Sequence, residues 1–350
     1  MRRKERYRLG IVGLGRMGST IDDEVIGYPA ITLPYSIAAA ARASSRLELA
    51  VGCDTLYDKR MAFSERWGVS QTYVMYERML AQAELDMVAI CTRGRSHAEI
   101  TLAATAAGVP MIFCEKAMAC SLREADAVRN AVQQRGTCFN TGVLRRFDSR
   151  YHRAREVIAS GALGELRAAV HYAPASLLHG HIHSIDTLLY LLGDVPIEAV
   201  RGEFQPRDLT FTDGRLEPDP RATYQLRFAG GIEAWSVPAG NWEFEILGTE
   251  GSLRSGNNGS DWLLRRKKPV GTRFSQWERE EFSPGEGRSA TVACLEDLVR
   301  AYESGSLTLG HVQITHHATE ACFAVADSHC RGGVWVDLPL TERDRYIYHV

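Results

Sequence analysis

The sequence predicts an α/β chain: an N-terminal doubly wound parallel sheet, then a C-terminal α+β domain with a large open, mainly antiparallel sheet. Three observations predict it. Short, almost continuously apolar runs alternate with helix-like segments near the start, as in a parallel sheet covered on both faces. Beyond Leu192, polar and apolar residues alternate, as in antiparallel strands. A chain of 350 residues exceeds one typical domain, so we expect two, at 1–142 and 143–350.

Charge, hydropathy and cysteine spacing argue against several classes of protein. The formal net charge is −2, which argues against a nucleic-acid partner. No apolar run reaches membrane-spanning length, and the basic residues at the start precede no apolar leader, so we expect neither a membrane partner nor an export signal. None of the eight cysteines forms a C-x-x-C pair. We therefore expect a reduced, cytoplasmic protein without a structural zinc site.

A glycine-rich turn follows the first apolar run, Leu9 to Val12. Its pattern is Gly13-x-Gly15-x-x-Gly18. Such glycines permit a tight strand-to-helix turn, a close approach of backbone to a pyrophosphate, and close packing of helix on strand. The turn therefore predicts a dinucleotide-binding Rossmann domain, with Arg16 and Met17 contacting the cofactor beside the three glycines.

The next apolar run, Leu47 to Cys53, ends at Asp54. An acid at this point accepts hydrogen bonds from the adenosine ribose and repels a 2′-phosphate. Asp54 therefore predicts NAD rather than NADP as the cofactor.

The helix expected after Gly18 is interrupted. Residues 19–35 contain two prolines and the acidic cluster Asp22-Asp23-Glu24, and helical composition returns only at Ser36. We interpret this as an insertion of about fifteen residues beside the cofactor loop. A lid over the cleft and a passive surface loop are both consistent with it.

The remaining elements follow from periodicity and turn signals. In the first domain we expect strands at Leu85–Thr92, Val109–Cys114 and Gly136–Thr141, and helices at His97–Gly108 and Ser121–Gln134. In the second domain we expect helices at Ser149–Ser160, Ala290–Ser304 and His311–Arg331, and strands at Glu165–Tyr172, Thr223–Phe228, Gly231–Val237 and Trp242–Leu247.

Three polar clusters are candidates for chemistry. They are Thr92–His97 at one strand end, Glu115-Lys116 at the next, and the histidine-rich run from His179 to Asp186. Ligands of doubly wound sheets bind beyond the carboxyl ends of the strands. We therefore expect cofactor contacts from Thr92, His97, Glu115 and Lys116.

Taken together, these motifs resemble the glucose–fructose oxidoreductase/inositol dehydrogenase/MocA (Gfo/Idh/MocA) family. The resemblance rests on Gly13–Gly18, Cys114-Glu-Lys116, Arg145–Asp148, Ser160–Glu165 and His183-x-x-Asp186. It implies NAD(P)-dependent oxidation or reduction of a sugar or polyol hydroxyl. It also implies Lys116 and His183 as catalytic residues, and His179, which stands where an aspartate is common, as a third catalytic candidate. It further implies homodimers or homotetramers formed through the C-terminal sheet.

The chain departs from the family pattern at three positions. Ala117 stands where proline is usual; because a cis bond before a non-proline residue costs about 3–4 kcal/mol, we expect a trans peptide there. Arg93 replaces another usual proline. His179 removes a negative charge from the neighbourhood of His183.

The resulting mechanism is a hypothesis. His183 takes the proton of a substrate hydroxyl, and Lys116 stabilises the developing alkoxide. Arginines could hold an anionic substrate group, or could be solvated or paired structurally. The candidate substrate-binding residues are Arg93, Arg95, Lys116, Arg146, His179 and His183. A metal ion shared by His179 and His183 is the alternative for the histidine cluster.

The sequence thus predicts an NAD-dependent dehydrogenase or reductase that acts on a small carbohydrate or polyol. One alternative is a hydrolase or lyase that retains NAD and cleaves a glycosidic bond through transient oxidation. Another is a non-catalytic sensor that keeps NAD bound.

Overall fold

The structure is a computed structural model that describes residues 3–349. It divides into two compact units. The first runs through Phe147 and also takes in Arg288–His316 and the chain from Tyr348; the second comprises Asp148–Gly287 and His317–Ile347. The predicted boundary at 142/143 lies close to Phe147 and Asp148, where the chain first passes from one unit to the other. Residues 288–316, which lie beyond the predicted boundary, belong to the first unit by their contacts.

A six-stranded parallel sheet forms the centre of the first unit, and its order is β3-β2-β1-β4-β5-β6. This is the dinucleotide-binding order predicted from the glycine turn. The strands are β1 (Tyr7–Val12), β2 (Leu47–Cys53), β3 (Thr72–Tyr73), β4 (Met87–Ile90), β5 (Met111–Cys114) and β6 (Cys138–Thr141). The residues of β4 and β5 are all buried, as expected of strands covered on both faces.

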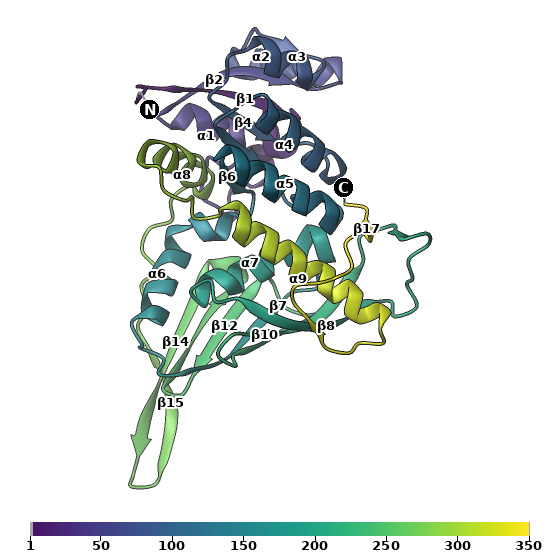
Figure 1. The fold of residues 1–350 in the computed structure, drawn as a ribbon. Coiled ribbons are helices and arrows are strands. Elements are labelled where there is room, and N and C mark those ends of the chain that lie inside the picture. Colours follow the sequence, from purple (N-terminus) through teal and green to yellow (C-terminus); the bar gives the residue numbers. More distant parts are fainter. Residues whose placement is uncertain (1–2, 350) are drawn as a thin grey trace. The chain divides into compact units, whose positions relative to one another are not determined.

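Helices flank this sheet (Figure 1). They are α1 (Ile37–Ala43), α2 (Tyr57–Trp67), α3 (Tyr76–Gln82), α4 (His97–Ala106), α5 (Leu122–Arg135) and α8 (Ala290–Ser304). Local sequence sets their ends. In α5, for example, the side chain of Ser121 accepts the amide of Glu124, and Gly136 ends the helix at a φ of 65°.

Helix α8 packs on the sheet of the first unit, although it lies beyond residue 143 in the sequence. Cys294, Leu295 and Leu298 of this helix are fully buried in the same apolar core as β1, β2 and β5. The Nδ2 of Asn140 on β6 also donates to the carbonyl oxygen of Cys294 (3.0 Å). Burial of the apolar face of α8 on this sheet, more than 150 residues away in sequence, assigns the helix to the first unit. Sequence order alone does not reveal such a return.

The predicted interruption after Gly18 is confirmed. A π-helical turn, Arg16–Thr20, and a 3-10 turn, Ile21–Glu24, precede an irregular segment, and α1 begins only at Ile37. The carboxylate of Asp22 fixes the far end of this segment, because it accepts the amides of Tyr35 (2.7 Å) and Ser36 (3.1 Å). Its middle faces solvent, where the Ile26 side chain is 71% exposed.

A nine-stranded sheet dominates the second unit, in the order β15-β14-β13-β12-β7-β11-β10-β8-β16. Among the described residues of this sheet, only the β7–β11 pair is parallel, so the predicted mainly antiparallel sheet is confirmed. Its strands are β7 (Leu166–Tyr172), β8 (Ile197–Gln205), β10 (Arg221–Phe228), β11 (Glu233–Val237), β12 (Glu243–Gly248), β13 (Gly251–Gly256), β14 (Asp261–Val270), β15 (Phe274–Glu280) and β16 (Val336–Asp337).

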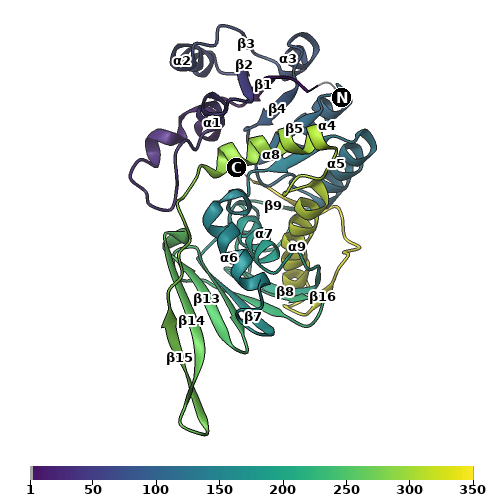
Figure 2. The ribbon, with the colours of Figure 1, turned by 90° about the vertical axis from the view of Figure 1, so that its left-hand side faces the viewer.

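Helices α6 (Ser149–Ala159) and α7 (Ile182–Leu191) lie over one face of this sheet (Figure 2). A long helix, α9 (Val312–Cys330), follows α8, and two short strands, β9 (Arg215–Leu216) and β17 (Tyr346–Ile347), pair in parallel. The β14–β15 hairpin extends beyond the other strands of the sheet, and every residue of β15 is exposed. Within 3–349, no helix has both the length and the apolar character needed to cross a bilayer.

Candidate active site

The glycine turn has the shape that a dinucleotide needs. Gly13 has a φ of 92°, and a Cβ there would lie 2.6 Å from the carbonyl of Cys91. A Cβ on Gly18 would lie 2.0 Å from the oxygen of Gly13. At Gly15 the nearest atom is the flexible Nζ of Lys59, at 3.5 Å. The turn is therefore closed against the protein at Gly13 and Gly18 and open at Gly15, which fits a bound pyrophosphate.

Asp54 is fixed at the end of β2. Its Oδ2 accepts the amide of Leu14 (3.0 Å) and its Oδ1 accepts the amide of Leu56 (2.9 Å). The Nζ of Lys59 lies 4.0 Å from Oδ2. The carboxylate therefore stands beside the glycine turn, at the position from which an acid contacts the ribose of a dinucleotide.

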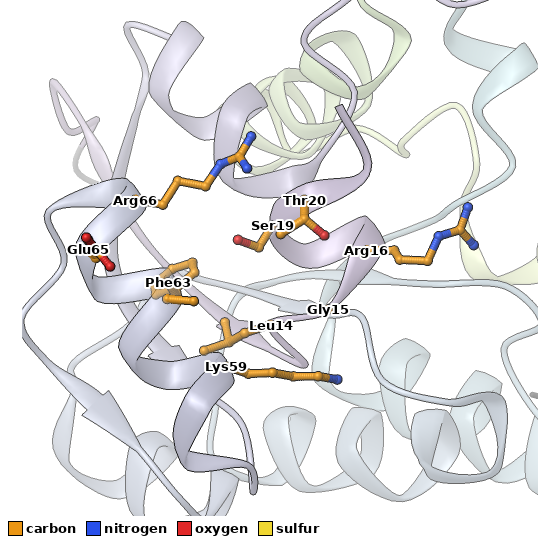
Figure 3. A pocket seen from close by; sticks show the side chains of 10 residues that line it. Leu14, Gly15, Arg16, Ser19, Thr20, Lys59, Phe63, Glu65 and Arg66 are labelled. Atoms are coloured by element: carbon orange, nitrogen blue, oxygen red, sulfur yellow. The ribbon is translucent and has the colours of Figure 1, made fainter. Parts of the chain in front are cut away.

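A pocket of about 590 Å³ opens between the π-helical turn and α2. Figure 3 shows its lining: Leu14, Gly15, Arg16, Ser19, Thr20, Lys59, Ala62, Phe63, Glu65 and Arg66. Two of its cations pair with acids of the insertion. Arg16 contacts Glu24 (2.7 Å) and Arg66 contacts Asp23 (2.5 Å). Met17, the other predicted contact in the turn, packs against the apolar core.

Glu115 and Lys116 follow β5 directly, at the carboxyl edge of the sheet. Glu115 is buried, and burial raises the pKa of its carboxyl to about 7, although the charge of Lys116 opposes the shift. Its Oε2 accepts the amide of Lys116 (3.2 Å). Gly142 leaves room for this carboxyl, because a Cβ there would lie 2.5 Å from Oε1. The Lys116 side chain is half-buried.

The backbone after Lys116 contradicts one prediction. The Lys116–Ala117 peptide is cis, although the absence of proline led us to expect trans. Two histidines from other segments contact the carbonyl within this peptide and the carbonyl of the next one. Nε2 of His349 donates to the Lys116 oxygen (2.9 Å), and Nδ1 of His97 lies 2.7 Å from the Ala117 oxygen. We expected a trans peptide from the identities of two adjacent residues alone, and that reasoning does not include such contacts.

His97 was predicted to contact the cofactor, and the structure places it beneath the strand ends. Its ring is 1% exposed, and its Nε2 faces the carbonyl oxygen of Thr92 at 3.0 Å. Burial lowers the pKa of this imidazole, against the two carbonyl contacts that raise it. Both ring nitrogens are therefore used within the protein, where they join the end of β4 to the segment after β5.

The predicted substrate arginines fall into two groups. Arg93 and Arg95, after β4, are exposed. Arg146 is 1% exposed, and its guanidinium donates to the carbonyl oxygen of Leu309 (3.4 Å). The prediction that Arg146 binds substrate is therefore corrected: its side chain is enclosed by the protein and presents no surface to a ligand.

The histidine cluster lies in the second unit, around the start of α7. His183 is half-buried, and its ring meets Trp242 edge-on with centroids 6.1 Å apart. His179 is exposed, and its amide donates to Asp219 (2.7 Å). His181 is buried, with Nε2 2.8 Å from the Ala222 oxygen, and burial lowers its pKa to about 4.

The metal alternative gains no support from this arrangement. Among the described residues, no group of three or more His, Cys, Asp or Glu side chains is placed to hold a metal ion. His181 faces the core, whereas His179 faces solvent. Asp186, the last residue of the histidine-rich run, lies buried inside α7.

A parallel sheet in dinucleotide-binding order, a glycine turn open at Gly15 and a Glu-Lys pair at the same carboxyl edge define a nicotinamide-dependent oxidoreductase. The chain belongs to the Gfo/Idh/MocA oxidoreductase family. Residues 24–143 match its NAD-binding Rossmann fold, and residues 171–338 match its C-terminal alpha/beta domain. The resemblance seen in the sequence and the prediction of NAD are confirmed.

Curated relatives and solved structures agree with this assignment. The chain is 27% identical to 1,5-anhydro-D-fructose reductase of Ensifer adhaerens, over 62% of this chain and 69% of that protein. It is also 27% identical to scyllo-inositol 2-dehydrogenase (NAD(+)) of Bacillus subtilis, over 71% and 74%. For Myo-inositol 2-dehydrogenase of Thermotoga maritima, 24% identical, the match spans 53% of this chain and about half (55%) of that protein.

Among solved structures, levoglucosan dehydrogenase in complex with NADH and levoglucosan superposes with a TM-score of 0.73 at 19% identity, over 96% of this chain and 100% of that chain. An inositol dehydrogenase homolog from Azotobacter vinelandii, in complex with NADH and myo-inositol, gives a TM-score of 0.73 at 20% identity, over 95% and 98%. At these identities the likeness shows the shared fold.

Proposed function

We propose that the protein transfers a hydride between NAD and a secondary hydroxyl or keto group of a sugar, a polyol or a sugar derivative. The observation that carries the proposal is the Glu115-Lys116 pair, which follows β5 in a domain that matches an NAD-binding family. The names of the relatives, an anhydrofructose reductase and inositol dehydrogenases, support a carbohydrate or polyol as the substrate class.

In this proposal the cofactor is held by the glycine turn, with Asp54 as the ribose acceptor and Arg16 beside the pyrophosphate. When bound, the cofactor would supply the hydride chemistry: its oxidised form, NAD, would accept a hydride from the carbon of the hydroxyl group, and its reduced form, NADH, would donate one to a keto carbon. The ammonium of Lys116 donates a hydrogen bond to the reacting oxygen and stabilises its developing charge. A ring nitrogen of His183 takes the hydroxyl proton during oxidation and returns it during reduction.

His179 has a smaller part in the proposal. Its side chain faces solvent, and its amide is anchored to Asp219. We assign it to substrate contact rather than to proton transfer. Replacing His179 with alanine should therefore raise the KM for substrate more than it lowers kcat.

The exposed Arg93 and Arg95 are proposed to bind an acidic substituent of the substrate. A comparison of a neutral sugar with its uronic acid or its phosphate tests this assignment. A lower KM for the anionic compound, abolished when both arginines are replaced by glutamine, supports it. Equal KM values for the neutral and anionic compounds would remove both residues from the substrate site.

Cleavage of a glycosidic bond through transient oxidation was the alternative reaction. The relatives named above are dehydrogenases and reductases, which supports net redox chemistry instead. A turnover screen tests the choice. It offers NAD and NADP with free sugars, inositols, uronic acids and aryl glycosides, and it reads both absorbance at 340 nm and leaving-group release. Net NADH formation supports the proposal; aglycone release without NADH would overturn it.

We further propose a cytoplasmic homodimer or homotetramer that associates through the C-terminal sheet. Large apolar side chains are exposed on the sheet and its hairpin: Trp235 is 37%, Trp277 40% and Phe274 72% exposed. Such side chains are frequent in protein interfaces. All eight cysteines are free thiols, which supports a reducing compartment. Light scattering of the wild type and of Trp235→Glu tests the assembly. We expect the wild type to be a multimer and the substitution to dissociate it.

A further inference from the structure

The end of the chain returns to the edge of the sheet that carries Lys116. Strand β17, Tyr346–Ile347, pairs with β9 in the second unit, and from Tyr348 the chain belongs to the first unit. His349 there is 4% exposed. Its Nε2 donates to the carbonyl oxygen of Lys116 at 2.9 Å, across a separation of 233 residues.

We propose that His349 is a positioning residue for Lys116: it fixes the backbone of the lysine, so that the ammonium is presented at one place beyond β5. The inference rests on the proposed function, in which Lys116 contacts the substrate oxygen. No feature of the sequence around His349 suggested this role.

The peptide groups on the two sides of Lys116 are each held by a side chain. On the amino side, the carboxyl of Glu115 accepts the Lys116 amide (3.2 Å). On the carboxyl side, His349 donates to the Lys116 carbonyl (2.9 Å). One residue further, the Ala117 carbonyl contacts Nδ1 of His97 (2.7 Å). The direction of the Cα–Cβ bond of Lys116 follows from these peptide planes, so a lost contact changes where its side chain begins.

Packing locks the His349 ring in this position. Gly94, which precedes α4, lies directly against it. A Cβ on Gly94 would be 2.3 Å from the imidazole Cδ2, 2.9 Å from Cγ and 3.0 Å from Cβ of His349. The ring therefore occupies the space that any other residue at position 94 would need. A methyl group there displaces the imidazole without altering its hydrogen-bonding atoms, which provides a second, independent perturbation.

The same geometry argues against direct proton transfer by His349. Its Nε2–H is committed to a backbone carbonyl, and the ring is almost fully enclosed. A general base must reach the proton that it takes. His349 therefore acts through Lys116.

The test compares His349→Phe, which removes the donor, His349→Gln, whose side-chain amide restores one, and Gly94→Ala. His311→Phe serves as the control, since the imidazole Nδ1 of His311 contacts the side chain of Gln313, two residues away (2.7 Å). With NAD and the free sugar, inositol or uronic acid that the turnover screen selects, we expect His349→Phe and Gly94→Ala to lower kcat about 10- to 100-fold. The glutamine variant should keep most of the wild-type kcat, and the Kd for NADH should change by less than about twofold in all variants.

A second readout needs neither substrate nor cofactor. In the cofactor-free protein, hydrogen exchange of the amides in residues 115–121 should become at least about threefold faster in His349→Phe and Gly94→Ala. It should stay at the wild-type rate in His349→Gln and His311→Phe. Unchanged exchange in the phenylalanine and alanine variants would overturn the proposed positioning.

Lys116→Ala separates a failure of this inference from a failure of the proposed function. If Lys116→Ala keeps wild-type turnover, the catalytic assignment of Lys116 is wrong. If Lys116→Ala abolishes turnover while His349→Phe keeps wild-type kcat, the function stands and the inference is overturned. If Lys116 is catalytic and His349 positions it, adding His349→Phe to Lys116→Ala should lower the residual rate by less than about twofold, because the two residues act through one contact.

Discussion

Oδ2 of Asp54 accepts a hydrogen bond of 3.0 Å from the amide of Leu14, the residue between the first two glycines of the turn. The acid that we propose as the ribose acceptor is thus bonded to the turn that we propose to hold the pyrophosphate. Lys59 stands next to both, 4.0 Å from Asp54 and 3.5 Å from the position of a Cβ on Gly15. In this proposal, cofactor affinity and cofactor choice are coupled at this point of the first unit.

Replacing Asp54 with alanine should weaken NADH binding and reduce the preference for NAD. The variant loses the ribose acceptor and the anion that repels a 2′-phosphate, and it leaves the Lys59 cation in place. We expect the Kd for NADH to rise about tenfold and the NAD-to-NADP ratio of kcat/KM to fall by at least as much. Asp58→Ala, at the exposed first turn of α2, is the control. An unchanged ratio in Asp54→Ala would exclude Asp54 from cofactor selection.

Two glycine substitutions should separate folding from cofactor binding. In Gly18→Ala the new Cβ meets the Gly13 oxygen at 2.0 Å, so the turn itself must distort. We expect a loss of about 1–3 kcal/mol in the free energy of unfolding together with loss of NADH binding. In Gly15→Ala only the Lys59 ammonium lies nearby. This variant should unfold at the wild-type urea concentration yet bind NADH at least about tenfold more weakly. Equal destabilisation of both variants would contradict the account.

The free energy of unfolding of the first unit should fall as pH rises from 4.5 to about 7. Burial raises the pKa of Glu115 to about 7 from 4.5. An acid whose folded pKa is raised stabilises the fold fully below the unfolded pKa and loses this contribution as pH rises through the folded pKa. Between pH 4.5 and about 7 we expect a loss of about 3 kcal/mol from this group. Urea unfolding of Glu115→Gln should lack this slope, whereas Glu65→Gln, an exposed site, should retain it.

The second unit should show the opposite dependence. Burial lowers the pKa of His181 from 6.5 to about 4. A base whose folded pKa is depressed contributes stability above the unfolded pKa, and this contribution is lost as pH falls through the folded pKa. Acidification from pH 6.5 to about 4 should therefore remove about 3 kcal/mol. His181→Gln should abolish that slope in urea titrations; an identical slope in the variant would assign the acid sensitivity to another group.

Much of the fold could be predicted because local chemistry determines it. The apolar runs that became β4 and β5, the glycine turn, and the capping residue Ser121 each act within a few residues of themselves. The interruption after Gly18 was visible because proline and acidic residues disfavour a buried helix. The positions of Asp54 and Glu115-Lys116 at strand ends could be predicted because the strands themselves were visible as apolar runs, and ligands bind at such ends in this fold.

What the sequence could not provide depends on contacts between distant residues. The return of α8 to the first sheet and the burial of Arg146 involve contacts across more than 100 residues. The cis peptide after Lys116 has no local signal, because no proline follows the lysine. Arg145 and Arg146 are adjacent and chemically identical, yet Arg146 is enclosed while Arg145 is half-buried. His349 lacked any local signal, since a histidine near the end of a chain has no characteristic role.

The steady-state rate of NADH formation by Lys116→Ala, with NADH affinity measured in parallel, decides whether Lys116 is catalytic. We expect kcat to fall at least about 100-fold while the Kd for NADH stays within about twofold of the wild type. A variant that binds NADH normally and turns over at nearly the wild-type rate would contradict the catalytic assignment.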